Sequence, residues 1–285
     1  MEPRKPPWLK KRLPPMEALV KIKSILDQAK LHTVCEEARC PNLGECFAQG
    51  TATFLIMGRV CTRNCAFCAV EQGLPSSLDP SEPQHVAEAV QAMKLRYVVI
   101  TSVTRDDLPD GGASHFVETI RAIHSRDPDI RVEVLIPDFK GDIFALGKVL
   151  EACPDVLNHN VETIPRLYPR VRPQSDYARS LELLEKVKTM GLPILTKSGL
   201  MLGLGEQREE VLEVLQDLRK VGCDFLTMGQ YLQPRSDRLP VFRYLPPEEF
   251  EEYKRMGEAL GFETVASGPF VRSSFHAFQM FESHP

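Results

Sequence analysis

The chain of 285 residues lacks the features that mark membrane, disordered or nucleic-acid-binding proteins. No apolar run approaches the roughly 18 residues of a membrane span, and there is no internal repeat or low-complexity segment. The 35 basic residues do not outnumber the 39 acidic ones, so the overall basic field of nucleic-acid binders is absent. No apolar signal-peptide core follows the basic, proline-rich residues 1–15. We therefore expect a globular, cytoplasmic protein without a membrane or nucleic-acid partner.

Cysteine is the residue type with the most informative distribution. Of the 8 cysteines, all but two lie between Cys35 and Cys68. Thiols stay reduced in the cytoplasm, and disulfides within so short a stretch would close only small loops. We therefore interpret this group as metal ligands or catalytic groups. Cys153 and Cys223 stand apart, and we expect each to be a small buried apolar residue.

Strand-like and helix-like runs alternate along most of the chain. Helical stripes are predicted at 16–30, 176–190 and 209–221, and the last two end at a glycine. The predicted strands are 53–57, 97–101, 132–136, 155–158, 194–197, 225–228 and 263–266. This order predicts an α/β fold, a partial or complete parallel (β/α) barrel of six to seven units. We expect an N-terminal extension (1–50), the barrel (51–267) and a C-terminal extension (268–285).

The second cysteine triplet has the spacing C-x3-C-x2-C and comprises Cys61, Cys65 and Cys68. Three thiolates on one short loop can bind three corners of an iron–sulfur cube and leave the fourth iron open to a small molecule. The alternative is zinc, which needs four protein ligands for a closed structural site. Cys65 with Cys68 would then supply one half of that site and Cys35 with Cys40 the other.

The first triplet, Cys35-x4-Cys40-x5-Cys46, also offers three ligands rather than four. It indicates a second cluster with an unusual fourth ligand. The alternative is a helical hairpin with several buried cysteines.

With these triplets, the chain resembles the lipoyl synthase family of the radical S-adenosylmethionine superfamily. The first triplet and the Arg-Ser-Ser-Phe-His-Ala segment at 272–277 narrow the resemblance to that family. Further segments of similar sequence lie at 38–42, 103–108, 110–113, 158–163, 197–199, 203–206 and 229–234. The chain departs from the family pattern at Phe275, where tyrosine is usual, and at 235–240, which lacks the usual histidine before Leu-Pro.

The resemblance implies a sulfurtransferase that inserts two sulfur atoms, at C6 and C8, into a protein-bound octanoyl chain. It implies two 4Fe-4S clusters and S-adenosylmethionine as cofactors. Cys61, Cys65 and Cys68 would hold the S-adenosylmethionine cluster; Cys35, Cys40, Cys46 and Ser274 would hold the auxiliary cluster, which is the sulfur source. The cofactor contacts would be Phe67, Thr101, Asn160, Glu162, Lys197, Gly203 and Gly205, with Arg272 contacting the substrate. Cys61, Cys65, Cys68 and Ser274 are the expected catalytic residues.

The implied partners are an octanoylated lipoyl carrier domain or the glycine-cleavage H protein, an electron donor such as flavodoxin or ferredoxin, and a carrier that rebuilds the cluster. The basic residues of the 1–15 arm could guide docking of an acidic partner, or simply be solvated. Rival interpretations are a two-cluster electron-transfer protein, a structural zinc-ribbon module and a different radical enzyme.

Several residues carry a plainer alternative. Ser273 or Ser274 would cap a helix, the Gly203–Glu206 stretch would be an ordinary strand-to-helix turn, and His159 would be a hydrogen-bonded core histidine. Arg105, Asp106 and Asp107 would orient ligands, or pair with one another at the rim.

Overall fold

The computed structural model describes residues 4–10, 16–48 and 51–284, and the chain divides into two compact units. The N-terminal unit comprises Arg12–Arg63 and Ala69–Leu157. The C-terminal unit comprises Met1–Lys11, Asn64–Cys68 and Asn158–Pro285. The loop that bears the second cysteine triplet therefore contributes to both units.

Parallel strands and their connecting helices form the N-terminal unit. Its elements are α1 (Met16–Gln28), β1 (His32–Thr33), α2 (Val34–Glu37), α3 (Leu43–Ala48), β2 (Thr53–Ile56), β3 (Val60–Cys61), β4 (Glu71–Gln72), α4 (Glu82–Ala92), β5 (Tyr97–Ser102), α5 (Ala113–Arg126), β6 (Arg131–Leu135), η2 (Phe139–Gly141) and α6 (Ile143–Glu151). Strand β7 (Val156–Asn158) begins in this unit and ends in the other.

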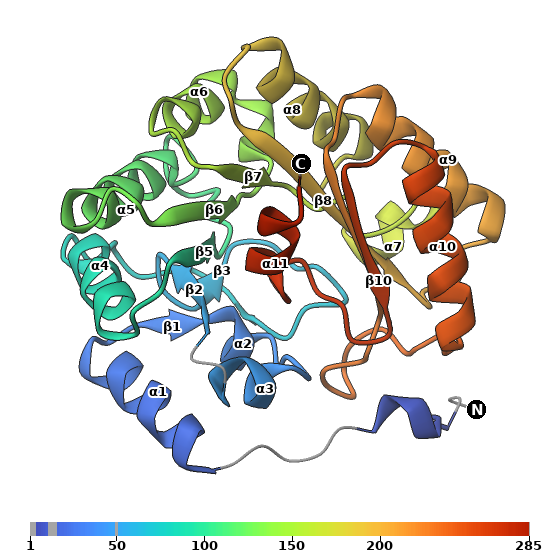
Figure 1. Cartoon of the computed structure of the whole chain (residues 1–285), viewed down its shortest axis with the longest axis horizontal. Helices are drawn as coiled ribbons and strands as arrows, with labels where there is room; N and C mark the ends of the chain where they lie inside the picture. Colours follow the sequence, from blue (N-terminus) through green and yellow to red (C-terminus); the bar gives the residue numbers. More distant parts are fainter. Residues whose placement is uncertain (1–3, 11–15, 49–50, 285) are drawn as a thin grey trace. The chain divides into compact units, whose positions relative to one another are not determined.

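In the N-terminal unit, β2, β5 and β6 are parallel neighbours, and β1 pairs antiparallel with β2. Strand β5 is rich in β-branched residues and buried through Thr101, the pattern of a parallel strand covered on both faces. Helices α4, α5 and α6 run in a row beside these strands, as Figure 1 shows. Parallel strands place their carboxyl ends at one edge, where the loops after β2, β5 and β6 meet.

Helix α5 begins with a carboxylate that binds free backbone amides. Asp110 accepts hydrogen bonds from the amides of Gly112 (3.0 Å) and Ser114 (2.9 Å) and from the Ser114 hydroxyl (2.5 Å). Burial alone would raise the pKa of Asp110, but these bonds and the Lys148 ammonium outweigh it and lower the pKa to about 2. The loop after β5 is therefore fastened where its helix starts.

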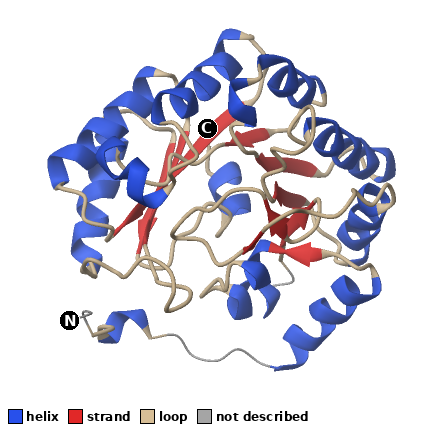
Figure 2. Ribbon diagram, turned by 180° about the vertical axis from the view of Figure 1, so that it is seen from behind, coloured by secondary structure: helices blue, strands red, loops and turns tan. Residues whose placement is uncertain are grey.

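The C-terminal unit repeats the same alternation. Its elements are η1 (Pro7–Leu9), η3 (Pro165–Leu167), α7 (Tyr168–Val171), α8 (Tyr177–Thr189), β8 (Leu195–Leu202), α9 (Arg208–Lys220), β9 (Phe225–Gln230), α10 (Pro247–Ala259), β10 (Thr264–Gly268) and α11 (Ala277–Glu282). Strands β8, β9 and β10 are parallel neighbours. Figure 2 shows the strands in red and the helices in blue.

Local signals explain the helix ends in the C-terminal unit. Helix α8 starts where the Asp176 side chain accepts from the Arg179 amide at 2.8 Å. At the start of α9, the Gln207 amide donates to the Glu210 carboxylate at 2.8 Å. Soon after these helices end, Gly191 and Gly222 adopt the left-handed conformation that glycine tolerates best.

The structure confirms the predicted α/β class with parallel strands, and the predicted strands and long helices are present close to their expected limits, except that the strand predicted at 194–197 extends to Leu202 as β8. Among the described residues, no helix is both long and apolar enough to cross a bilayer. The three-part division at 1–50, 51–267 and 268–285 stays a prediction.

One detail differs from expectation. Cys223 is buried as predicted, but Cys153 is exposed and occupies a left-handed turn position (φ 52°) just after α6. In the arm, Pro7–Leu9 forms a short 3-10 turn, which proline permits at its start; Leu9 is buried, whereas the basic residues Arg4, Lys5 and Lys10 are exposed. Residues 1–3 and 11–15 of the arm lie outside the described residues.

Candidate metal centres and cofactor site

The first cysteine triplet lies on two short helices of the N-terminal unit. Cys35 is in α2, which begins where the Thr33 hydroxyl accepts from the Glu36 amide at 3.3 Å, and Cys46 is in α3. Cys40 lies between them, its amide donating to the Cys35 carbonyl at 3.0 Å. These local bonds bring the three thiols of the triplet into one region.

The Cys35 thiol is buried, and the other two thiols of the triplet contribute to its electrostatic environment. Burial raises the pKa of the Cys35 thiol to about 12, and both Cys40 and Cys46 add to the rise. A protonated, desolvated thiol of this kind loses its proton when it ligates a metal, because the metal charge replaces it. A donor set of three soft sulfurs, of which Cys35 is buried and Cys40 and Cys46 are half-buried, fits an iron–sulfur cluster.

Cys61, the first member of the second triplet, is placed by strand β3. Strand β3 pairs with β4, and the Gly73 amide donates to the Cys61 carbonyl at 3.0 Å. The Cys61 sulfur accepts two backbone N–H bonds, from Arg63 at 3.4 Å and from Thr104 at 3.3 Å. Hydrogen bonds to a ligating sulfur are a common way for a protein to set the properties of an iron–sulfur cluster. The surroundings of Cys61 therefore fit a cluster ligand.

Cys65 and Cys68 lie on the part of the loop that belongs to the C-terminal unit. The Cys68 amide donates to the Cys65 carbonyl at 3.1 Å, which makes a tight turn around Phe67. Within the same unit, the Ala66 amide donates to the Val171 carbonyl (2.9 Å), and the Leu239 amide donates to the Ala66 carbonyl (3.1 Å). This turn is thus fastened on both sides of Ala66.

In the described ranges, no three His, Cys, Asp or Glu side chains are arranged to hold a single metal ion.

A cluster of polar side chains follows β7 in the C-terminal unit. The Asn160 amide nitrogen donates to the Glu162 carboxylate at 3.1 Å and to the Ser273 hydroxyl at 2.7 Å. Arg172 donates to the Asn160 carbonyl at 2.8 Å. Among the described residues, the side-chain oxygen of Asn160 is buried without a hydrogen-bond partner. A buried acceptor of this kind is expected to bind a donor from a ligand.

Glu162 belongs to the same polar cluster and has an unusual backbone conformation and electrostatic environment. Its φ of 64° is in the left-handed region, which a non-glycine residue occupies at a cost. Burial raises the pKa of Glu162, while Arg172, the Asn160 amide and Arg272 oppose the rise. Strain and opposed charges at one residue are typical of a binding site.

Gly199 of β8 lets the polar side chains of this cluster lie close to the strand backbone. A Cβ there would lie 2.7 Å from the Asn160 side-chain oxygen, 2.8 Å from the Thr227 hydroxyl and 3.0 Å from the Ser273 hydroxyl. A larger residue at this position would have to displace these side chains, because real Cβ atoms essentially never lie closer than 3.0 Å to such atoms. Sequence reasoning did not identify Thr227, Ser273 or Arg172 as parts of this cluster; only the fold of the C-terminal unit brings them together.

Two other predicted cofactor residues are buried within strands. Lys197 of β8 has no exposed surface. Thr101 of β5, in the N-terminal unit, donates its hydroxyl to the Leu135 carbonyl at 3.0 Å. Their predicted cofactor contacts stay predictions.

The glycine loop after β8 uses its own amides internally. Glu206 accepts hydrogen bonds from the amides of Gly203 (2.6 Å), Leu204 (2.9 Å) and Gly205 (3.0 Å). A Cβ at Gly203 would lie 2.5 Å from the Arg243 carbonyl. The geometry is that of a closely packed strand-to-helix turn. A contact of Gly203 or Gly205 with the cofactor stays a prediction, and it would have to use groups other than these amides.

The Arg-Ser-Ser segment follows β10 and is not a helix start. Helix α11 begins at Ala277 with His276 at its N-cap, and no side chain caps it, so the capping alternative for Ser273 and Ser274 is wrong. Ser273 accepts the Asn160 hydrogen bond, whereas no described residue bonds to the Ser274 hydroxyl. Arg272 donates to the Val271 carbonyl at 2.6 Å. Of the two serines, Ser274 is the one whose oxygen is available to a ligand.

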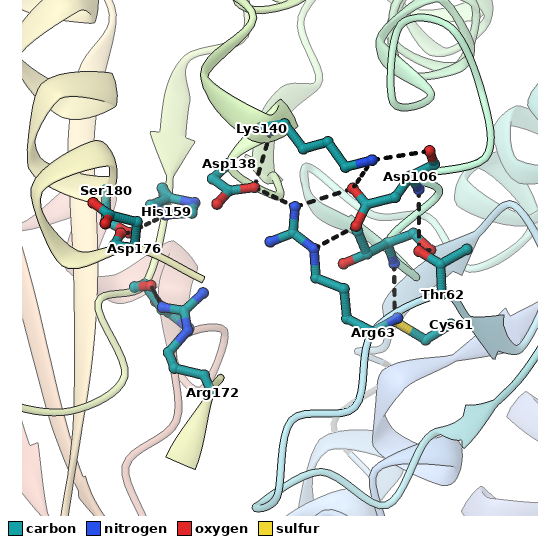
Figure 3. Close-up of polar contacts among 12 residues, drawn as sticks. Cys61, Thr62, Arg63, Asp106, Asp138, Lys140, His159, Arg172, Asp176 and Ser180 are labelled. Carbon is teal, nitrogen blue, oxygen red and sulfur yellow. Dashed lines mark hydrogen bonds and ion pairs between the residues drawn. The ribbon is translucent and has the colours of Figure 1, made fainter. Parts of the chain in front are cut away.

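The remaining candidates have structural partners, several of which Figure 3 shows. His159 is a core histidine, 3.1 Å from the Ser180 hydroxyl. Arg105 pairs with Asp107 at 2.8 Å, but Asp106 pairs with Arg63 instead.

Comparison with known proteins identifies the family. Residues 55–218 match the Radical SAM superfamily, and residues 1–40 match the N-terminal domain of lipoyl synthase of that family. A lipoyl synthase of Caldanaerobacter subterraneus subsp. tengcongensis is 58% identical over 97% of this chain and 97% of its own length. One from Laribacter hongkongensis is 56% identical over 97% of this chain and 88% of its own length.

Solved structures support the fold. The methylornithine synthase PylB superposes with a TM-score of 0.55 over 90% of this chain and 83% of its own, at 13% identity. The maturase HydG gives a TM-score of 0.56 over 87% and 71%, at 15% identity. Identity this low shows a shared fold and no more. Because the chain is more than half identical to lipoyl synthases over nearly its full length and matches both family domains, it belongs to the lipoyl synthase family of the radical SAM superfamily.

Proposed function

We propose that the chain inserts two sulfur atoms, at C6 and C8, into an octanoyl chain bound to a protein, and so forms the lipoyl group. The proposal rests on sequence identity of 56–58% with lipoyl synthases over 97% of this chain. Both cysteine triplets of the family pattern support it. An unactivated C–H bond resists any acid or base of a protein, so a cofactor must supply the chemistry.

We assign Cys61, Cys65 and Cys68 to the S-adenosylmethionine cluster and Cys35, Cys40, Cys46 and Ser274 to the auxiliary cluster. When bound, these clusters and S-adenosylmethionine supply the radical that removes hydrogen atoms and the sulfur that replaces them. The chain's own part is to hold and shield the clusters. Cys35 does so by burial, and Cys61 through the two amides on its sulfur.

Ser274 is proposed as the exchangeable ligand of the auxiliary cluster. A hydroxyl oxygen is a hard ligand for an iron that prefers sulfur, so it leaves more readily than a thiolate. The described structure supports this choice over Ser273, because only Ser273 is occupied by Asn160. A cluster that must give up sulfide benefits from one weak bond.

We assign Phe67, Thr101, Asn160, Glu162, Lys197, Gly203 and Gly205 to cofactor binding and Arg272 to the substrate. Asn160 and Glu162 have the best support, since the first has an unpartnered buried oxygen and the second a half-buried carboxylate bonded to the Asn160 amide. Their roles here are to orient a polar ligand by hydrogen bonds and charge. No general acid or base is assigned, because hydrogen-atom abstraction needs none.

The proposed partners are an octanoylated lipoyl carrier domain or the glycine-cleavage H protein, a flavodoxin or ferredoxin as electron donor, and a carrier that rebuilds the auxiliary cluster. A cytoplasmic location and the division into extension (1–50), barrel (51–267) and C-terminal extension (268–285) belong to the same proposal. Because the octanoyl chain is tethered to a folded protein, recognition must extend beyond the pocket.

Two cysteine variants test the division of roles. Cys65→Ala should abolish cleavage of S-adenosylmethionine and leave about half of the iron. Cys40→Ala should keep cleavage to 5′-deoxyadenosine but stop sulfur insertion. Cys153→Ala, at an exposed thiol, is the matched control and should change neither. Equal loss of cleavage in both folded variants would contradict the assignment.

A further inference from the structure

The cluster loop is tied to the rest of the N-terminal unit by a buried arginine. Arg63 lies two residues after Cys61, and its side chain is 4% exposed. Its guanidinium donates to both oxygens of Asp106, at 2.7 and 3.0 Å, and to Asp138 at 2.6 Å. Asp138 has no exposed side-chain surface. Figure 3 shows the guanidinium between the two carboxylates.

The two carboxylates come from the ends of neighbouring strands. Asp106 lies on the loop after β5, and Asp138 on the loop after β6, where its side chain also accepts from the Lys140 amide at 3.1 Å. The planar fork of arginine can bind both carboxylates at once, which a lysine ammonium cannot do with the same geometry. Arg63 therefore fixes the cluster loop to two rigid points of the sheet.

A second set of bonds joins the same loops next to the sulfur. The Thr62 amide and hydroxyl both donate to the Thr104 carbonyl, at 3.0 and 2.9 Å, and the Asp106 amide donates back to the Thr62 hydroxyl at 3.1 Å. The amides of Arg63 and Thr104 are the two that donate to the Cys61 sulfur. The ion pairs and the N–H···S bonds are therefore parts of one arrangement.

We propose that Arg63, through Asp106 and Asp138, is a positioning residue that aims two backbone amides at the Cys61 sulfur and thereby sets the stability and the reduction potential of the cluster that Cys61 ligates. The inference rests on the proposed role of Cys61 as an iron ligand. Reduction adds negative charge to the cluster, and N–H bonds to a ligating sulfur stabilise that charge. Loosening the arrangement should therefore lower the potential and speed cluster loss.

The test uses the protein with both clusters bound, and the auxiliary cluster is the internal reference. Arg63→Lys keeps the charge but loses the fork. Asp106→Asn keeps the buried pair of Arg63 with Asp138, and so gives a second variant should Arg63→Lys fail to fold. Arg131→Lys is the matched control, because Arg131 forms an ion pair with Asp155 at 2.8 Å in the same unit, away from the loop that bears Cys61.

The readouts are iron released to a chelator over time and the reduction potential of each cluster by spectroscopic titration. We expect Arg63→Lys and Asp106→Asn to release the iron of the S-adenosylmethionine cluster several-fold faster and to lower its potential, with the auxiliary cluster and the control unchanged. Unchanged release and potential would overturn the proposal. So would an equal effect on both clusters, which would make the ion pairs a general part of the fold. Neither iron release nor the reduction potential depends on sulfur insertion. A chain that fails to insert sulfur would therefore still give a clear answer about Arg63.

Discussion

Changing Ser273 to alanine should loosen the C-terminal segment without removing a proposed cluster ligand. The Ser273 hydroxyl accepts one hydrogen bond from the neutral Asn160 amide, at 2.7 Å. Loss of such a bond typically costs about 1 kcal/mol, which corresponds to about a fivefold change in an equilibrium constant. The local opening of residues 271–277 should therefore become about five times more frequent.

Hydrogen exchange measures this opening directly. The amides to follow are those of Phe275 and Ala277. The first donates to the backbone carbonyl of Arg272 at 3.0 Å, and the second to the backbone carbonyl of Ser274 at 3.4 Å. Both should exchange about fivefold faster in Ser273→Ala. Ser267→Ala is the control. It removes a hydrogen bond from the Ser267 hydroxyl to the Phe250 carbonyl (2.8 Å) elsewhere in the same unit, and should leave the exchange of these two amides unchanged.

Product analysis separates the two serines. Ser273→Ala should still cleave S-adenosylmethionine and should form lipoyl product at a reduced yield, because its neighbour Ser274 is less well placed. Ser274→Ala should cleave the cofactor and form no product, and Ser274→Cys should release sulfur more slowly, since thiolate suits iron better than oxygen. Unaltered exchange in Ser273→Ala, or a normal product yield from Ser274→Ala, would refute the reasoning.

Three further predictions concern the described structure. Asp110→Asn should cost about 1–2 kcal/mol of unfolding free energy at neutral pH. Because the pKa of Asp110 falls from 3.8 to about 2 on folding, this difference should fade as the pH drops from about 4 to 2. Denaturant titrations of the iron-free chain measure it. Gly229→Ala should displace the C-terminal segment, seen as faster proteolysis there, since the new Cβ would lie 2.0 Å from the Val271 carbonyl; Gly268→Ala, with its nearest contact at 3.4 Å, should not. Neutralising the basic residues within 4–10 should raise the KM for octanoylated carrier at low salt only, whereas an equal effect on a short octanoyl-lysine peptide would show that the charges do not guide docking.

The parts of this structure that depend on local pattern were predictable from the sequence. The spacing of Cys61, Cys65 and Cys68 indicates a cluster because ligands on one short loop must converge wherever the loop lies. The strands were predictable because their β-branched runs are short and separated by helical stripes.

Contacts between distant residues were not predictable. The bond between Asn160 and Ser273 joins residues 113 positions apart, and nothing local to either serine indicates which one is occupied. The partners of Arg63 lie 43 and 75 positions away. Cys153 resembles a core residue in sequence, yet its left-handed turn exposes it. In each case the three-dimensional arrangement of strands and turns decides the contact.

The source of the inserted sulfur tests the central claim most directly. The clusters would be assembled with isotopically heavy sulfide, and the protein would then be given octanoylated carrier, S-adenosylmethionine and a reductant in the presence of light sulfide. Mass spectrometry of the carrier after one turnover should show a lipoyl group in which both sulfur atoms are heavy, and Cys40→Ala should form none. A product with light sulfur, or a carrier that gains no sulfur, would contradict the proposal that this chain forms the lipoyl group from its own auxiliary cluster.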